Sequence, residues 1–285
     1  IHELLKALAS EIKNIRSEDE ARDWGRNMAQ TLLSSPDFSS LKEGVSGKFA
    51  AERMCYEASA VSAGVYRQLA ASNFKIRDVE KWYYIPVGGD VSAGGKVDRV
   101  DECDGLVRVI DYKTGNISYT AEEYYAGVKL QLPLYLLAAS KGKRPAGAYY
   151  FPANVEFGDK PAGDFTLKGF MDCGEEVVRN TDKTIKDKER SAFVDAYLNG
   201  RQLAGGLPEE DFSDFIAYSA LIAKRGAKEM FGGNIAPSPF TGACDYCKMG
   251  GMCGFAAGPD SRPRSVDGIT CADVARIVKK LRGEE

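Results

Sequence analysis

The sequence predicts an α/β (α+β) fold in which helices flank a central mixed β-sheet. Three observations carry this prediction. Residues 1–71 place apolar side chains at helical spacing. Residues 79–152 change to short runs of aromatic and β-branched residues separated by turn residues. A long amphipathic segment follows Pro208. Helices before and between strands are typical of a sheet whose faces are covered by helices.

Three helices are predicted in the N-terminal region. In residues 1–16 one helical face carries Ile1, Leu4, Leu5, Leu8, Ile12 and Ile15. Ser17 and Glu20 have the capping-box spacing that starts a second helix, which we expect to end near Leu33. A third helix is predicted from about Ser46 to Ala71.

The strands are predicted over residues 79–87, 95–101, 106–113 and 145–152. The segment GGDVSAGG between the first two predicts a turn. The third run is almost unbroken in its apolar residues, as expected for a strand that is buried on both faces. Between the third and fourth strands, residues 120–140 predict one helix.

In the C-terminal half, the sequence predicts secondary structure only for some segments. Residues 165–171 predict a strand or an edge hairpin, and the charged residues 174–192 predict a surface helix. The helix from Pro208 is expected to end at Gly232 and Gly233. Thr270 and Asp273 have the capping-box spacing that starts a last short helix. We expect a main domain over residues 1–240 and a cysteine motif over residues 241–258. A linker with a short helix is expected over residues 259–285.

Composition narrows the possible functions. The net charge is −3, whereas a domain that grips nucleic acid by itself is usually basic, so the charge favours a module that receives its strand from another protein. No apolar run reaches the roughly 20 residues of a membrane span, so no membrane partner is expected. Seven unevenly spaced cysteines indicate a reducing, cytoplasmic compartment. The chain opens at Ile1 inside an amphipathic pattern without a signal peptide, and we interpret it as a piece of a longer protein.

Two aspartates and a lysine predict a metal-dependent phosphodiesterase. Asp98 closes one predicted strand, and Asp111 and Lys113 lie at the end of the next. Two carboxylates hold a divalent cation, and a lysine beside them orients the attacking water. Asp111 and Lys113 share one face of the strand, and a charge within a buried run is costly without a partner or a metal. The alternative is two turn aspartates and a surface lysine.

These residues stand in motifs that resemble the RecB-type branch of the PD-(D/E)XK nucleases. The motifs are G-x-x-D-R-x-D at residues 95–101, D-Y-K-T-G at 111–115 and Q-x-x-x-Y at 131–135. The resemblance implies a PD-(D/E)XK nuclease core. It also implies that Mg²⁺ or Mn²⁺ is bound by Asp98, Asp111 and the backbone carbonyl of Tyr112, with Lys113 acting on the water.

Three further residues belong to this resemblance. Gln131 and Tyr135 share a helical face, and in the family they lie beside the active site, although core packing is the alternative. His2, the only histidine, stands in IHELL, which resembles the family segment H-x-x-L, and is expected to be a third metal ligand. The alternative is a structural histidine. Glu80 lies where family members often carry a strand glutamate, and we assign it no chemistry.

Cys244, Cys247 and Cys253 form a C-x2-C-x5-C motif. The spacing predicts a metal site, with a zinc knuckle or inert thiols as alternatives. The motif and its lead-in G-x-I-x-P-x-P resemble the end of the AddB/RexB nuclease subunits, where an upstream cysteine completes a [4Fe–4S] site. We expect that fourth ligand upstream of Ile1, with Cys55 as the weaker candidate. The structural thiols are expected to be Cys103, Cys173 and Cys271.

The resemblance to the C-terminal nuclease domain of that family extends from residue 1 to about residue 255. It implies a magnesium-dependent exonuclease that hydrolyses one DNA strand as a duplex is unwound, in double-strand break repair and recombination. The implied partners are single-stranded DNA and an AddA-type helicase–nuclease subunit in the bacterial cytoplasm. Two alternatives stay open: a stand-alone RecB-like exonuclease, and a non-catalytic DNA-binding or scaffolding module with a structural metal cluster.

Overall fold

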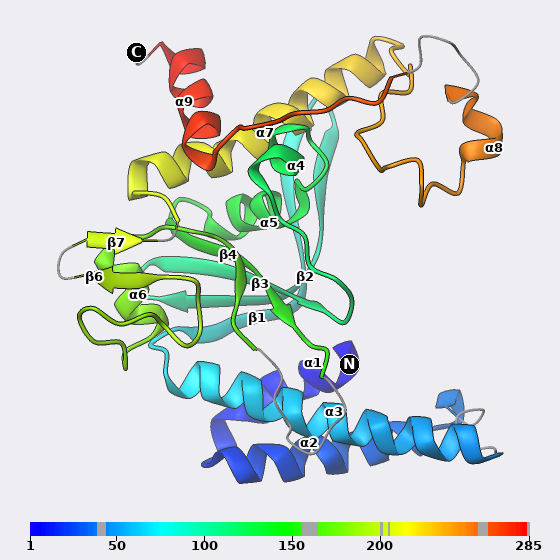
Figure 1. Cartoon of the computed structure of the whole chain (residues 1–285), viewed down its shortest axis with the longest axis vertical. Helices are drawn as coiled ribbons and strands as arrows, with labels where there is room; N and C mark the ends of the chain where they lie inside the picture. The colour runs from blue at the N-terminus through cyan, green and yellow to red at the C-terminus, as the bar shows by residue number, and fades with distance from the viewer. Residues whose placement is uncertain (39–43, 156–164, 200–201, 205, 256–261, 284–285) are drawn as a thin grey trace.

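A five-stranded sheet lies between two groups of helices (Figure 1). The computed structural model describes residues 1–38, 44–155, 165–199, 202–204, 206–255 and 262–283. The helices are α1 (His2–Glu11), η1 (Ile12–Asn14), α2 (Glu18–Leu33), α3 (Gly44–Ala70), α4 (Ala121–Tyr125), α5 (Gln131–Ser140), α6 (Glu175–Thr181), α7 (Glu209–Phe231), α8 (Gly250–Cys253) and α9 (Cys271–Arg282). The strands are β1 (Lys75–Gly88), β2 (Val91–Cys103), β3 (Leu106–Lys113), β4 (Arg144–Pro152), β5 (Lys168–Met171), β6 (Tyr197–Asn199) and β7 (Gln202–Ala204).

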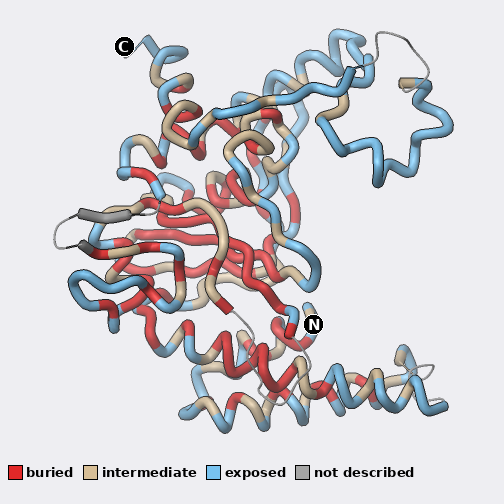
Figure 2. Tube along the Cα trace, viewed as in Figure 1, coloured by how far each residue is buried: buried red, intermediate tan, exposed pale blue. Residues whose placement is uncertain are grey.

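The sheet is mixed, as the sequence predicts. Its strand order is β1-β2-β3-β4-β5, with β3 and β4 parallel and the other neighbours antiparallel. Strand β3 is the middle strand, and every residue of it except Lys113 is buried. The continuous apolar run therefore marks the centre of the sheet, which Figure 2 shows as a buried layer.

The predicted turn and the predicted fourth helix are both wrong in extent. The GGDVSAGG segment is mostly strand, because β1 continues to Gly88 and β2 begins at Val91. Only two residues remain for the turn, and Gly89 adopts a φ of +52° there. The helix over 120–140 is two helices, α4 and α5, since Gly127 at φ +80° interrupts the helical backbone between them.

Hydrogen bonds of side chains at helix ends differ from the prediction in two places. The Ser17 hydroxyl accepts from the Glu20 N–H as expected, but the Glu20 carboxylate accepts from the Arg16 N–H, so the reciprocal bond is shifted by one residue. The charged helix predicted over 174–192 ends at Thr181. The next residue, Asp182, accepts from the backbone and hydroxyl of Thr184, and such local bonds compete with helix.

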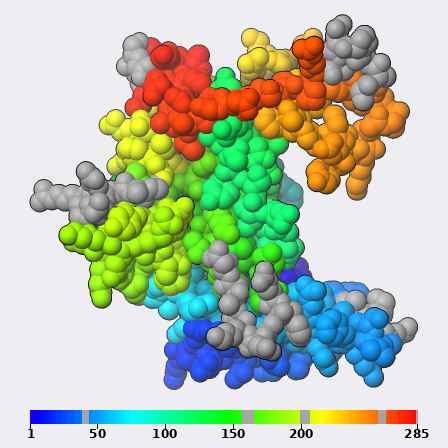
Figure 3. Space-filling view, in the orientation of Figure 1, coloured from blue at the N-terminus to red at the C-terminus, as the bar shows by residue number. Residues whose placement is uncertain are grey.

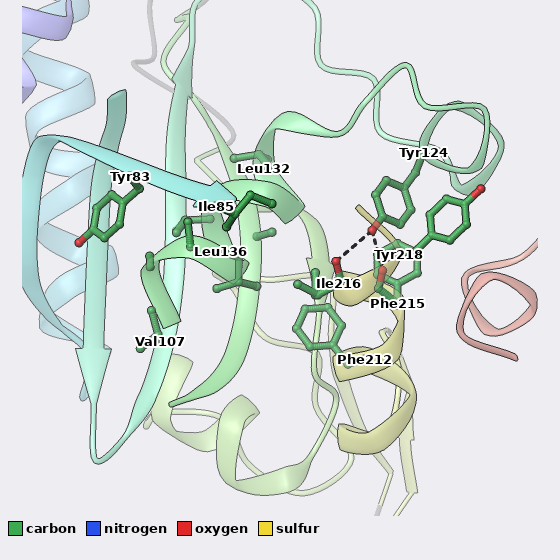
Figure 4. Packing of buried hydrophobic residues seen from close by; sticks show 14 of the residues in the cluster. Tyr83, Ile85, Val107, Tyr124, Leu132, Leu136, Phe212, Phe215, Ile216 and Tyr218 are labelled. Atoms are coloured by element: carbon green, nitrogen blue, oxygen red, sulfur yellow. Dashed lines mark hydrogen bonds between the residues drawn. The ribbon is translucent and has the colours of Figure 1, made fainter. Parts of the chain in front are cut away.

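Two hydrophobic layers hold the sheet. On one face the core joins β1–β4 to α5, α7 and α9, and Figure 4 shows part of it with the Tyr124 hydroxyl donating to the Phe215 carbonyl at 2.5 Å. On the other face, side chains of β3 and β4 pack against α1 and α3. None of the described helices is long and apolar enough to cross a membrane.

The C-terminal segment leaves the body and returns to it. Residues 234–253 are almost entirely exposed, and Figure 3 shows this segment (orange) standing away from the sheet. Helix α9 then packs against α7 with Val274, Ala275 and Val278 buried, and its predicted capping box of Thr270 and Asp273 is complete. Residues 256–261, where the predicted linker begins, lie outside the described residues.

Candidate active site

The predicted lysine and aspartates meet where β2 and β3 lie side by side. Lys113 Nζ lies 2.7 Å from Asp111 Oδ2, so both side chains share one face of β3, as their spacing predicts. Asp98 lies inside β2 rather than at its end. Because Arg99 pairs with Ile110 in the register, Asp98 still comes beside Asp111.

Asp98 is held in place by the backbone of β3. Its Oδ2 accepts from the Tyr112 N–H at 2.9 Å. The pKa of Asp98 is raised overall, chiefly by burial of the carboxyl group. The Tyr112 N–H and His2 act to lower this pKa, whereas the negative charges of Asp111 and Glu80 act to raise it. Carboxylates crowded into a partly dry site repel one another, and a bound dication would relieve that repulsion.

His2 reaches the same site from the first turn of α1. Its Nδ1 lies 3.5 Å from Asp98 Oδ2, and its side chain is about half exposed at 52%. The imidazole and the Tyr112 ring form a T-shaped pair with a centroid distance of 6.4 Å. Leu4 and Leu5, both buried, anchor this turn of the helix. The structure therefore brings His2 to Asp98.

The structure adds Glu80 to the site, a strand glutamate that the motifs alone leave without a chemical role. It lies opposite Asp98, since Val79 pairs with Arg99 and Lys81 with Val97. Ligand atoms of His2, Glu80 and Asp98 all lie within 4.8 Å of one another, the one such metal-sized group in the described part of the chain. Glu80 adopts a φ of +50°, which is uncommon for a residue with a side chain. The resemblance marks this strand glutamate, but its position beside Asp98 depends on the hairpin register, which the mispredicted turn hides.

Gln131 and Tyr135 border the site from α5. Gln131 Nε2 donates to Asp111 Oδ1 at 3.3 Å and to the Tyr135 hydroxyl at 3.4 Å. The Tyr135 ring lies against Gly95, where an added Cβ would come within 2.3 Å of the hydroxyl oxygen. The structure thus places Gln131 against Asp111, and Tyr135 against Gln131 and Gly95. The first glycine of G-x-x-D-R-x-D leaves room for the tyrosine.

The three motif cysteines lie far along the chain from this site, on an exposed segment. Cys244, Cys247 and Cys253 are exposed, and the Cys247 sulfur accepts from the Met249 N–H at 3.4 Å. In the described residues their sulfur atoms do not approach one another closely enough to enclose a single ion. An iron–sulfur cluster spreads its cysteines more widely, so the cluster stays a prediction.

The other cysteines are less exposed than the motif cysteines. Cys55 is buried in α3 and Cys103 is buried in β2. Cys173 and Cys271 are partly buried, and burial raises the pKa of Cys271 to about 11. A raised pKa keeps a thiol protonated and a poor metal ligand.

This fold and this group of residues define a nuclease. The sequence model of the PD-(D/E)XK nuclease superfamily matches residues 1–254. The chain therefore belongs to the PD-(D/E)XK nuclease superfamily, whose members generally use divalent metal ions.

The chain is also similar to individual proteins that all carry the same name. The chain is similar to the B-type subunit of the ATP-dependent helicase/deoxyribonuclease of Caldanaerobacter subterraneus subsp. tengcongensis, at 31% identity over 199 residues, 59% of this chain and 17% of that protein. The protein of the same name from Alkaliphilus metalliredigens is 26% identical over 226 residues, 68% of this chain and 20% of that protein. The one from Carboxydothermus hydrogenoformans is 36% identical over 124 residues, 39% of this chain and 11% of that protein. The chain spans a fifth or less of the length of these relatives.

Proposed function

We propose that this chain is the nuclease domain of an AddB-type subunit of a bacterial helicase–nuclease, and that it hydrolyses phosphodiester bonds of one DNA strand. The observation that carries the proposal is the grouping of Asp98, Asp111 and Lys113, with His2 and Glu80, where β1, β2 and β3 adjoin. Family membership and the names of the relatives support the same reaction and the same subunit.

The donor set fits Mg²⁺ or Mn²⁺. Carboxylate oxygens from Asp98 and Asp111, the backbone carbonyl of Tyr112 and the imidazole of His2 would hold the ion, with Glu80 as an additional carboxylate. Oxygen-rich sites with one imidazole suit these hard cations. When bound, the cation supplies a Lewis acid that polarises the phosphate and lowers the pKa of a water.

The protein's own groups position the reacting atoms. The Lys113 ammonium is fixed by Asp111 while its side chain remains 38% exposed, so it can orient a water and offset negative charge as the phosphate is attacked. Gln131 holds the second oxygen of Asp111, and Tyr135 braces Gln131. These contacts keep the Asp111 carboxylate in one orientation.

The partners follow from the same proposal. A strand of DNA would reach the site from a duplex unwound by an AddA-type helicase–nuclease subunit, during double-strand break repair and recombination. The net charge of −3 agrees with a domain that is handed its substrate. Cys244, Cys247 and Cys253 would share a [4Fe–4S] cluster with a fourth cysteine. Degradation of double-stranded DNA by this chain alone, without a helicase, would favour the stand-alone exonuclease instead.

Cleavage of end-labelled single-stranded DNA tests the proposal. We expect cleavage in Mg²⁺ and none in Ca²⁺, which fills oxygen sites but supports this chemistry poorly. Asp111→Asn should abolish cleavage and weaken Ca²⁺ binding in calorimetry, because it removes a ligand charge. Asp90→Asn, in the exposed hairpin turn, is the matched control and should keep both. Equal cleavage by the Asp111→Asn and parent proteins would refute the site.

Gly95→Ala is expected to slow cleavage by up to roughly 100-fold. The new methyl group would clash with Tyr135, whose displacement would release Gln131 from Asp111. Single-turnover rates measure the effect. Gly226→Ala, in α7 with nothing near its added Cβ, is the control. An unchanged rate for Gly95→Ala would show that Tyr135 does not support the site.

A further inference from the structure

The outer face of the β1–β2 hairpin exposes two aromatic rings. The side chains of Trp82 and Tyr84 are 59% and 57% exposed, whereas Tyr83 and Ile85, which alternate with them, are buried. The two exposed rings are parallel to within 5°, with centroids 5.8 Å apart. Large apolar groups gathered on a surface commonly mark a binding site, so this pair of rings points to a ligand with flat apolar faces.

This aromatic surface is continuous with the candidate active site. Lys96 lies directly opposite Trp82 in the register, and its ammonium pairs with the carboxylate of Glu80. Glu80 in turn belongs to the metal-sized group with Asp98. From the rise of a strand, the Cα atoms of Trp82 and Tyr84 lie about 7 Å and about 13 Å from that of Glu80. The two rings therefore lie at increasing distances from the candidate active site along strand β1.

The hairpin keeps the second ring uncovered. Gly94 lies opposite Tyr84, so no side chain from β2 lies across from the ring. Any Cβ at Gly94 would come within 2.0 Å of the Tyr83 carbonyl oxygen. The close approach of the two strands thus requires glycine at this position, and β2 places no side chain opposite Tyr84.

We propose, resting on the nuclease function above, that Trp82 and Tyr84 form a stacking platform for the bases of single-stranded DNA beside the metal site. Unpaired bases offer flat faces that stack on aromatic side chains, whereas a duplex stacks its bases internally. The Lys96 ammonium, between Trp82 and Glu80, supplies a positive charge for the phosphate next to the cleaved one. The platform selects a single strand and sets its path to the aspartates.

Tryptophan fluorescence tests the platform without cleavage. The chain has two tryptophans, Trp24 and Trp82, so Trp24→Phe makes Trp82 the only one, and the difference between parent and Trp82→Phe spectra gives a second measure. Titration is done in Ca²⁺ with an oligothymidylate of about ten nucleotides. We expect Trp82 emission to be quenched on binding. An unchanged emission, or no binding by the parent protein, would overturn the proposal.

Binding constants of ring variants give the second test. Trp82→Ala and Tyr84→Ala should each weaken binding roughly ten-fold, and the pair roughly a hundred-fold. Trp82→Phe should retain most of the affinity, and Phe49→Ala, which removes a ring of similar 56% exposure from α3, should retain all of it. Because no charge is lost, the salt dependence of the double variant should keep the parent slope.

The outcomes separate this proposal from the nuclease function. Unaltered affinity in the double variant overturns the platform, while cleavage by the parent still supports the nuclease. Quenching and ring-dependent binding without any cleavage in Mg²⁺ support the platform and refute the nuclease. If the double variant binds oligothymidylate normally but no longer associates with a helicase partner, the rings belong to a protein interface and the platform is again overturned.

Discussion

Replacing Lys113 by alanine is expected to slow DNA cleavage by about 10²- to 10⁴-fold, the range for losing one group that handles the proton of a reacting water. The lysine ammonium lies 2.7 Å from Asp111, in a position where it can also face a water. Its removal leaves the oxygen ligands of the proposed metal in place. Metal affinity should therefore be kept or increased, because the substitution deletes a positive charge beside the carboxylates.

This pairing of results distinguishes a water-orienting lysine from a structural one. Single-turnover cleavage at saturating DNA and Mg²⁺ gives the rate, and calorimetry with Ca²⁺ gives the affinity. Lys224→Ala, an exposed lysine of α7, should leave both at the parent value. A Lys113→Ala protein that cleaves within a few-fold of the parent rate contradicts the assignment, and one that loses metal binding as well shows that Lys113 mainly preserves the site's shape.

What the sequence predicts well in this site is what local periodicity controls. Asp111 and Lys113 share a face because strand side chains alternate, and the unbroken apolar run marks β3 as the central strand. Motif resemblance adds Gln131 and Tyr135, and in the structure Gln131 donates to Asp111 and to the Tyr135 hydroxyl.

What the sequence misses depends on pairing between distant residues. Glu80 joins the site only because β1 pairs with β2 through a two-residue turn, whereas the glycines predict a longer one. The register of a hairpin is fixed by its turn, so an error in turn length hides which residue faces Asp98. The break between α4 and α5 is similar, since apolar residues continue through it and the local signals are Gly127 and Pro133, a proline in the first turn of α5.

Two residues of the G-x-x-D-R-x-D motif belong to a buried network of ion pairs and have no role in the proposed chemistry. In G-x-x-D-R-x-D, the arginine and the second aspartate are Arg99 and Asp101, and both are fully buried. Asp101 accepts from Arg99 at 2.6 and 2.7 Å and from Arg108 at 2.9 Å. Gln68 of α3 accepts from Arg99, and the Arg108 guanidinium lies over the Phe74 ring. One carboxylate therefore balances two arginines and ties β2 and β3 to α3.

Asp101→Asn is expected to lower the free energy of unfolding by about 3–5 kcal/mol, because it leaves two buried guanidinium groups without a counter-charge. Thermal and urea unfolding measure the loss, with Asp90→Asn in the exposed turn as the control. A loss below about 1 kcal/mol would show that water or other groups already compensate the arginines.

The same network predicts how stability depends on pH. Burial alone would raise the pKa of Asp101, but Arg99 and Arg108 hold it below its ordinary value of 3.8. A folded-state pKa below the unfolded one gives stability that is complete above the unfolded pKa and is lost as the pH falls through the folded one. The difference in unfolding free energy between parent and Asp101→Asn proteins should thus be constant near neutral pH and shrink in acid below 3.8. A constant difference down to the acid unfolding of the parent would mean that Asp101 is not the titrating anion of the network.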